Sequence, residues 1–161
     1  VEENKGSLSD DEMREILNRY GDKIVLPVDL GVDVDGKREN MTLSELDGNG
    51  RIMDIGVETI EMLKSEIPEY DIAVINGPAG VFEDDRFALG TFEVLRAVSK
   101  AGYSVVGGGH ISTAARMIGI DRKMSHVSTG GGASLMFLSG ERLVALEVLK
   151  EYWEKRWSHY F

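Results

Sequence analysis

The spacing of apolar residues predicts an amphipathic helix close to the start of the chain. Apolar residues recur at positions 13, 16, 17 and 20, the interval that places side chains on one helical face. Ser9 precedes this run with Glu12 three residues later, which favours a capping box, and Gly21 is placed to end the helix. Residues 23–28 then predict a short buried strand. Residues 29–54 are polar and are expected to be irregular, with one or two edge strands.

A repeated order of strand, loop and helix dominates the rest of the chain. A helix expected over residues 57–67 ends at Pro68. The expected strands cover residues 72–75, 103–106 and 126–128, and the expected helices cover residues 85–101, 112–118, a segment ending near 138, and 141–152. This order predicts an α/β fold of three layers, Rossmann-like, with a mostly parallel sheet and helices on both faces. Because loops that follow parallel strands emerge at one edge, three loops should face a common crevice.

Composition narrows the class of protein. A chain of 161 residues suits one domain, and its formal net charge of −10 argues against binding nucleic acid or an anionic membrane surface. The absence of cysteine excludes disulfides and thiol chemistry. No apolar run is long enough to span a bilayer, and the polar start does not resemble a signal peptide. We therefore expect a cytoplasmic protein.

Two glycine triplets, at residues 107–109 and 130–132, lie between predicted strands and helices. Glycine lets a ligand approach the main chain closely, and a helix that follows presents unpaired N–H groups to phosphate. One such loop could be only a tight turn, but two at equivalent junctions favour phosphate binding. Neither triplet matches the P-loop or the GxGxxG dinucleotide fingerprint.

A third loop, at residues 76–83, follows the first strand of the predicted parallel sheet. Asn76 ends that strand at the edge where ligands of such sheets bind. Glu83 can accept hydrogen bonds from ribose hydroxyls, although a single carboxylate at a helix start often only complements the helix dipole. The position of Glu83 beside two phosphate-type loops favours a nucleotide site.

Four ordered motifs resemble the phosphoglycerate kinase family. They are Asn-Gly-Pro-Ala-Gly-Val-Phe-Glu at 76–83, Phe-Ala-Leu-Gly-Thr at 87–91, the triplet at 107–109, and residues 124–135. The match is strong over residues 54–138, and these residues resemble part of the family's nucleotide-binding, C-terminal lobe. The sequence Gly-Gly-Gly-His at 107–110 resembles the corresponding motif in archaeal members of the family. The resemblance implies reversible phosphoryl transfer between 1,3-bisphosphoglycerate and ADP, giving 3-phosphoglycerate and ATP, with Mg²⁺.

The resemblance also implies roles for the matching residues. Asn76 would lie beside the nucleotide phosphates, whereas Pro78 and Val81 would border the base and Glu83 would hold the ribose. The backbone that would bind phosphates belongs to Gly107, Gly108, Gly109, His110 and Ile111. The amides that would serve the transferring phosphoryl group belong to Gly109, Gly130, Gly131 and Gly132.

The chain departs from the family pattern at the expected metal site. His110 stands where the family has the aspartate that ligates Mg²⁺, and Ile111 stands where a serine or threonine is usual. Imidazole is a poor ligand for Mg²⁺, which prefers oxygen. The metal ligands are therefore left unassigned. Met136 replaces a usual glutamate, which we interpret as local packing.

Length is the largest departure from the family. Family members have two lobes and more than twice this length, so residues 1–161 are expected to be part of a nucleotide-binding lobe, truncated on its N-terminal side, with residues 151–161 as a tail. The resemblance assigns 3-phosphoglycerate to the other lobe, so this chain is expected to be inactive alone. Two alternatives stay open, a non-catalytic nucleotide- or phosphate-binding domain, and a domain-swapped fragment that forms homo-oligomers through exposed sheet edges.

Overall fold

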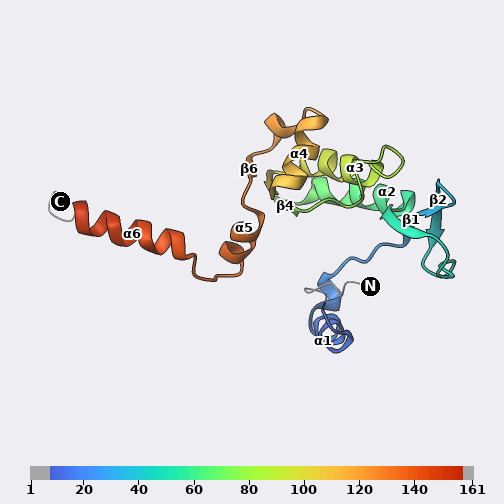
Figure 1. The fold of residues 1–161 in the computed structure, drawn as a ribbon, viewed down its shortest axis with the longest axis horizontal. Helices are drawn as coiled ribbons and strands as arrows, with labels where there is room; N and C mark the ends of the chain where they lie inside the picture. Colours follow the sequence, from blue (N-terminus) through green and yellow to red (C-terminus); the bar gives the residue numbers. More distant parts are fainter. Residues whose placement is uncertain (1–7, 158–161) are drawn as a thin grey trace.

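The structure is a computed structural model that describes residues 8–157 (Figure 1). The strands are β1 (Asp29–Val34), β2 (Lys37–Thr42), β3 (Arg51–Ile55), β4 (Ile72–Asn76), β5 (Tyr103–Gly107) and β6 (His126–Ser128). The helices are α1 (Asp10–Tyr20), α2 (Val57–Glu66), α3 (Leu89–Val98), α4 (Gly109–Met117), α5 (Gly131–Leu138) and α6 (Val144–Trp157). Short 3-10 turns lie at Gly21–Lys23, Ile67–Glu69 and Asp121–Lys123. Figure 1 shows α1 at one end of the chain, and α5 followed by α6 at the other, extending from a central body that contains the two sheets with α2, α3 and α4.

The central body contains a parallel sheet in the order β4-β5-β6, which confirms the predicted α/β class. Alternate residues of these strands, such as Ile75 and Val106, point into a core shared with α3 and α4. The opposite face of β4 leaves Val74 partly exposed. On that side the sheet, α5 and the residues leading into α6 line a cavity of about 630 Å³. The core therefore lies on the α3–α4 face of the sheet.

A second, antiparallel sheet in the order β2-β1-β3 occupies the segment expected to be irregular. Val34 pairs with Lys37, so β1 and β2 form a hairpin around Asp35 and Gly36, both with positive φ. An Asp-Gly turn between two strands is a strong hairpin signal. The prediction of mainly irregular structure was therefore wrong, although the one or two edge strands expected in this segment correspond to β2 and β3 at the edges of the sheet. The pairing gives β1 two neighbours and makes it the central strand.

The strand predicted at residues 23–28 is absent. Residues 21–23 form a 3-10 turn, residues 24–28 have no regular structure, and Leu26 is 57% exposed. An apolar run becomes a buried strand only when a neighbouring strand satisfies its backbone groups. No strand among residues 8–157 pairs with this segment, which explains the wrong prediction.

The first helix has the predicted start and end. Ser9 Oγ accepts a hydrogen bond from the Glu12 amide, and the Glu12 carboxylate accepts one from the Ser9 amide, so the capping box is confirmed. Gly21 is the C-cap. The apolar stripe of α1 is exposed, since no residue of this helix is buried.

The later helices differ from prediction mainly at their ends. Helix α4 begins inside the first glycine triplet, three residues before the expected Ser112. Helix α6 runs to Trp157, so the start of the predicted tail is helical, and residues 158–161 of that tail lie outside the described residues. Within the described range, none of the helices combines the length and apolar character needed to cross a membrane.

Candidate nucleotide-binding site

Three residues lie side by side where the parallel strands end. Asn76 is paired with Gly107, and Gly107 is paired with Ser128, at the last positions of β4, β5 and β6. The three loops singled out in the sequence leave the sheet from this row. Their predicted convergence on one edge is therefore present in the structure.

The two glycine triplets touch each other and are bridged by Asn76. The Asn76 side-chain amide donates a hydrogen bond to the Gly131 carbonyl at 3.2 Å, and the Gly108 amide donates one to the Ser128 carbonyl at 2.8 Å. A Cβ atom placed on Gly131 would lie 2.9 Å from the Gly108 Cα. Gly108 also has φ +112°, a conformation that favours glycine. Both triplets thus need glycine for their mutual contact.

The amides in the first turns of α4 and α5 are available to a ligand. Within residues 8–157, no protein acceptor is found for the amides of Gly109, His110 and Ile111, nor for those of Gly131, Gly132 and Ala133. Such amides, with the positive end of the helix dipole, suit an anion. The amides of Gly108 and Gly130 are different, because the first donates to the Ser128 carbonyl and the second to the Ser128 hydroxyl at 3.3 Å.

The side chains of His110 and Ile111 point to different environments. Ile111 is fully buried in the core, so only its main chain can reach a nucleotide. The His110 side chain is 57% exposed, and its ring packs against Phe82 with centroids 4.8 Å apart. His110 Nε2 also contacts Glu83 Oε1, which joins the start of α4 to the loop after β4. The hydrogen bond from His110 lowers the pKa of Glu83 below its usual value.

A second cavity gathers the residues predicted to meet the base and ribose. Its volume is about 460 Å³, and it lies between the loop after β4 and the antiparallel sheet. Pro78, Val81 and Glu83 line it, together with His110 and the β3 residue Met53. Asn76, Gly107 and Gly130 instead line the larger cavity over the open face of the parallel sheet. The predicted residues thus form two groups, which meet through Glu83 and His110.

The residues that the structure describes contain no ready-made cluster of metal-ligating side chains. No group of three or more histidine, aspartate or glutamate side chains among residues 8–157 could hold a metal ion. His110, at the position of the expected metal ligand, contacts Glu83 through Nε2. Since Mg²⁺ prefers a set of oxygen ligands, we assign no residue of this chain to it.

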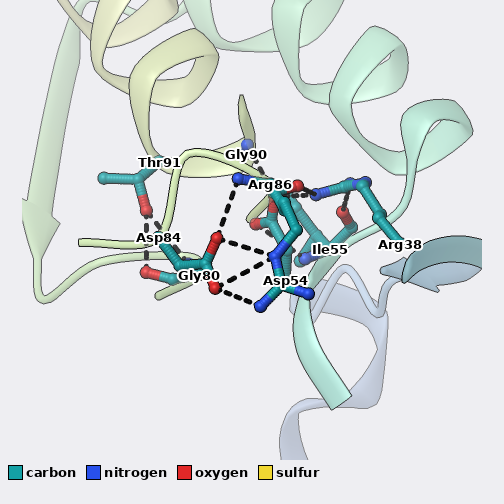
Figure 2. A network of polar contacts seen from close by, with 8 residues as sticks. All are labelled: Arg38, Asp54, Ile55, Gly80, Asp84, Arg86, Gly90 and Thr91. Atoms are coloured by element: carbon teal, nitrogen blue, oxygen red, sulfur yellow. Dashed lines mark hydrogen bonds and ion pairs between the residues drawn. The ribbon is translucent and has the colours of Figure 1, made fainter. Parts of the chain in front are cut away.

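Two features of the site were not among the predicted residues. The Ser128 hydroxyl accepts hydrogen bonds from the Gly130 amide and the Ser134 hydroxyl, and so shapes the second glycine loop. Ser128 lies within the family motif, which was the available signal. Figure 2 shows the other feature, a buried pair of Arg38 and Asp54 beneath the loop after β4. Nothing local in the sequence marks Arg38 for this role.

The fold and site place the chain in a class, namely α/β proteins whose glycine-rich loops gather at the carboxyl edge of a parallel sheet. A sequence model described as "Phosphoglycerate kinase" matches residues 1–141. The chain belongs to the phosphoglycerate kinase family.

Individual relatives agree with this membership. The chain is 62% identical over 158 residues to a phosphoglycerate kinase of Archaeoglobus fulgidus, covering 98% of this chain and 39% of the relative. It is 43% identical over 137 residues to phosphoglycerate kinase 1 of Methanosarcina acetivorans, covering 85% and 33%. The crystal structure of the Pyrococcus horikoshii enzyme superposes with a TM-score of 0.82 at 39% identity, covering 90% and 37%. The similarity to archaeal members agrees with the sequence resemblance, and the chain spans between a third and two fifths of these relatives' length.

Proposed function

We propose that this chain is the nucleotide-binding part of a phosphoglycerate kinase, which transfers a phosphoryl group reversibly between 1,3-bisphosphoglycerate and ADP, giving 3-phosphoglycerate and ATP. Family membership supports the reaction. The single observation that carries the site is the contact between the two glycine loops, bridged by Asn76. This contact points two helix N-termini at one edge of the sheet, where a polyphosphate would bind.

The phosphates are proposed to bind through main-chain amides. Phosphoryl transfer depends mainly on positioning and on stabilising charge that develops on the phosphoryl oxygens. The unpaired amides of Gly109, Gly131 and Gly132 supply fixed positive dipoles for this purpose. Because these dipoles act locally, a chain of net charge −10 can still bind an anionic nucleotide.

The base and ribose are proposed to bind in the cavity beside the antiparallel sheet. Pro78 and Val81 offer apolar walls to the base, and the Glu83 carboxylate accepts from the ribose hydroxyls. His110 holds one Glu83 oxygen and thereby orients the carboxylate. The hydrogen bond from His110 lowers the pKa of Glu83, and the ionised carboxylate offers only acceptor oxygens to the ribose hydroxyls.

Calorimetry with ADP tests the nucleotide site. Micromolar affinity supports the proposal, and the absence of binding heat at millimolar ADP contradicts it. Glu83→Gln should weaken ADP binding by about fivefold to tenfold, the loss expected for a partly exposed charge-assisted hydrogen bond. Glu69→Gln, an exposed change in the turn before β4, is the matched control and should leave affinity unaltered.

The chain alone is proposed to lack kinase activity. We propose that 3-phosphoglycerate binds to a region of the longer family members that this chain does not cover, since the chain spans 39% of the Archaeoglobus relative. Mixing the chain with 1,3-bisphosphoglycerate, ADP and Mg²⁺ should therefore yield no ATP above the uncatalysed rate. Robust ATP formation would show that the acyl-phosphate site lies within these residues.

Self-association is a second candidate property, favoured by the position of β4 at an edge of its sheet. Ile72 is 65% exposed and Val74 is 46% exposed on that strand. An uncovered apolar edge strand invites pairing with another chain. Sedimentation should show dimers or larger species that Ile72→Lys disperses, and a strictly monomeric profile excludes this property.

A further inference from the structure

We propose that Arg38, acting through Asp54, is a positioning residue for the loop of residues 77–88 between β4 and α3. The loop carries Pro78, Val81 and Glu83, so this inference rests on the proposed nucleotide site. Arg38 lies on β2, and Asp54 lies on β3. The antiparallel sheet would thus set the geometry of a loop that emerges from the parallel sheet.

Both side chains of the pair are largely withdrawn from solvent, and both make further hydrogen bonds. Arg38 Nη1 lies 2.7 Å from Asp54 Oδ2, and the two side chains are 14% and 0% exposed. The Asp54 carboxylate also accepts from the amides of Ile55 and Gly90, each at 2.9 Å. Arg38 Nη2 donates to the Ile55 carbonyl, also at 2.9 Å. Burial at this depth makes each partner dependent on the other, because a single buried charge is unfavourable.

The loop and the first turn of α3 pack against Asp54 from two sides. A Cβ atom on Gly80 would lie 2.2 Å from Asp54 Oδ1, and one on Gly90 would lie 2.1 Å from the same atom. Gly80 is also fastened to α3, since the Thr91 hydroxyl exchanges hydrogen bonds with its main chain. The Val81 amide donates to the Met53 carbonyl at 2.9 Å. The carboxylate therefore occupies the space that sets where Gly80 and Val81 run.

The hairpin and the loop also hold each other reciprocally, as Figure 2 shows in part. Arg38 of the hairpin donates to the Arg86 carbonyl of the loop at 3.1 Å. Arg86 of the loop donates to the Gly36 carbonyl of the hairpin turn and pairs with Asp84 beside it. The contacts of Arg38 with the Arg86 and Ile55 carbonyls need the fork of a guanidinium, which lysine lacks. Removing Arg38 should release the loop from the antiparallel sheet.

If Arg38 only stabilised the fold, its loss would leave the ADP affinity of the folded variant unchanged. A matched control variant separates this purely stabilising role from the proposed positioning role. Ser104→Ala removes a buried hydroxyl that bonds the Ser125 amide near the amino end of β5, away from the loop. We expect Arg38→Met to raise the dissociation constant for ADP about tenfold at a temperature where the variant stays folded. Ser104→Ala should lower the melting temperature and leave ADP affinity within about twofold of the unmodified chain. Equal affinities in the two variants would overturn the proposal.

Hydrogen exchange gives a readout that does not need ADP. In Arg38→Met the amides of Val81 and Gly90 should exchange faster, while the Ser112 amide in α4 keeps its protection. Arg38→Lys should retain most of the stability but still expose the Val81 amide. If the unmodified chain binds no ADP, the proposed function fails, and exchange alone decides the role of Arg38. Unchanged amide exchange at Val81 and Gly90 in Arg38→Met would contradict the proposed positioning role of Arg38.

Discussion

Replacing Asp29 should destabilise the chain, because the Asp29 carboxylate caps the N-terminus of helix α2. Helix α2 has Gly56 at its N-cap, with no side chain to satisfy the first amides. Asp29, from β1, takes that place: its carboxylate accepts from the Glu58 amide at 3.0 Å and the Thr59 amide at 2.8 Å. A Cβ atom on Gly56 would lie 2.1 Å from the Asp29 Cγ, so glycine leaves the room that the carboxylate fills.

The size of the effect follows from these contacts. Asp29 is buried, and the Thr59 hydroxyl adds a third hydrogen bond to its carboxylate at 2.7 Å. Losing a helix cap costs about 0.5–2 kcal/mol, and buried amides left without an acceptor add a further penalty. We expect Asp29→Ala to lower the free energy of unfolding by about 2–4 kcal/mol. For a chain of this size that shift lowers the melting temperature by about 10 °C.

The effect should also depend on pH in a known direction. Burial raises the pKa of Asp29, but hydrogen bonds from the Thr59 side chain and from the Thr59 and Glu58 amides outweigh it, so the pKa lies below the usual value. A lowered pKa in the folded state stabilises the chain above the unfolded pKa, and this contribution is lost as pH falls through the folded value. The deficit of Asp29→Asn should be full at pH 7 and should shrink below about pH 4.

Urea denaturation followed by circular dichroism measures this effect. Asp11→Ala is the control, since Asp11 is 97% exposed in the first turn of α1 and its loss should change stability by less than about 0.5 kcal/mol. If Asp29→Ala and Asp11→Ala unfold at the same urea concentration, the carboxylate does not cap α2 as described. An Asp29→Asn deficit that grows toward acid pH would contradict the proposed ionisation.

Two further pairs of substitutions, each a test and its control, probe the core and the site. Phe87→Ala should lower the free energy of unfolding by about 3–5 kcal/mol, because Phe87 is fully buried. Phe137 is 65% exposed on α5, so Phe137→Ala should change this free energy by less than about 0.5 kcal/mol. Equal urea midpoints for the two variants would contradict the burial of Phe87. Gly131→Ala should abolish ADP binding by pressing on the Gly108 backbone, while Gly132→Ala has open space and should bind nearly as well; calorimetry of both decides whether the contact between the loops matters.

Features with short-range causes were predictable from the sequence. The spacing of apolar residues and the Ser9–Glu12 pair predicted α1, because a capping box forms between residues three apart. The three strands of the parallel sheet and their glycine loops were predicted because each strand, loop and helix unit is encoded in one stretch of chain. The convergence of Asn76 with the two triplets followed from the topology of parallel sheets.

Other features of the site required the tertiary structure. Glu83 and His110 were each predicted as site residues, but their contact joins positions 27 apart. The division of predicted residues between two cavities depends on how the antiparallel sheet sits beside the loop. No local pattern in the sequence carries that information, and the motifs alone predict one continuous site.

The α/β class, the family and the three glycine-bearing loops could all be predicted from the sequence, since each rests on residues close together in the chain or on ordered motifs. The absence of a strand at residues 23–28 follows from the folded arrangement, because strand pairing needs a neighbouring strand from elsewhere in the chain. Only the tertiary structure decided that Asp29 caps a helix 29 residues away and that Arg38 meets Asp54 across 16 residues. A buried carboxylate looks the same in sequence as a solvated one, and only packing tells which partners it finds.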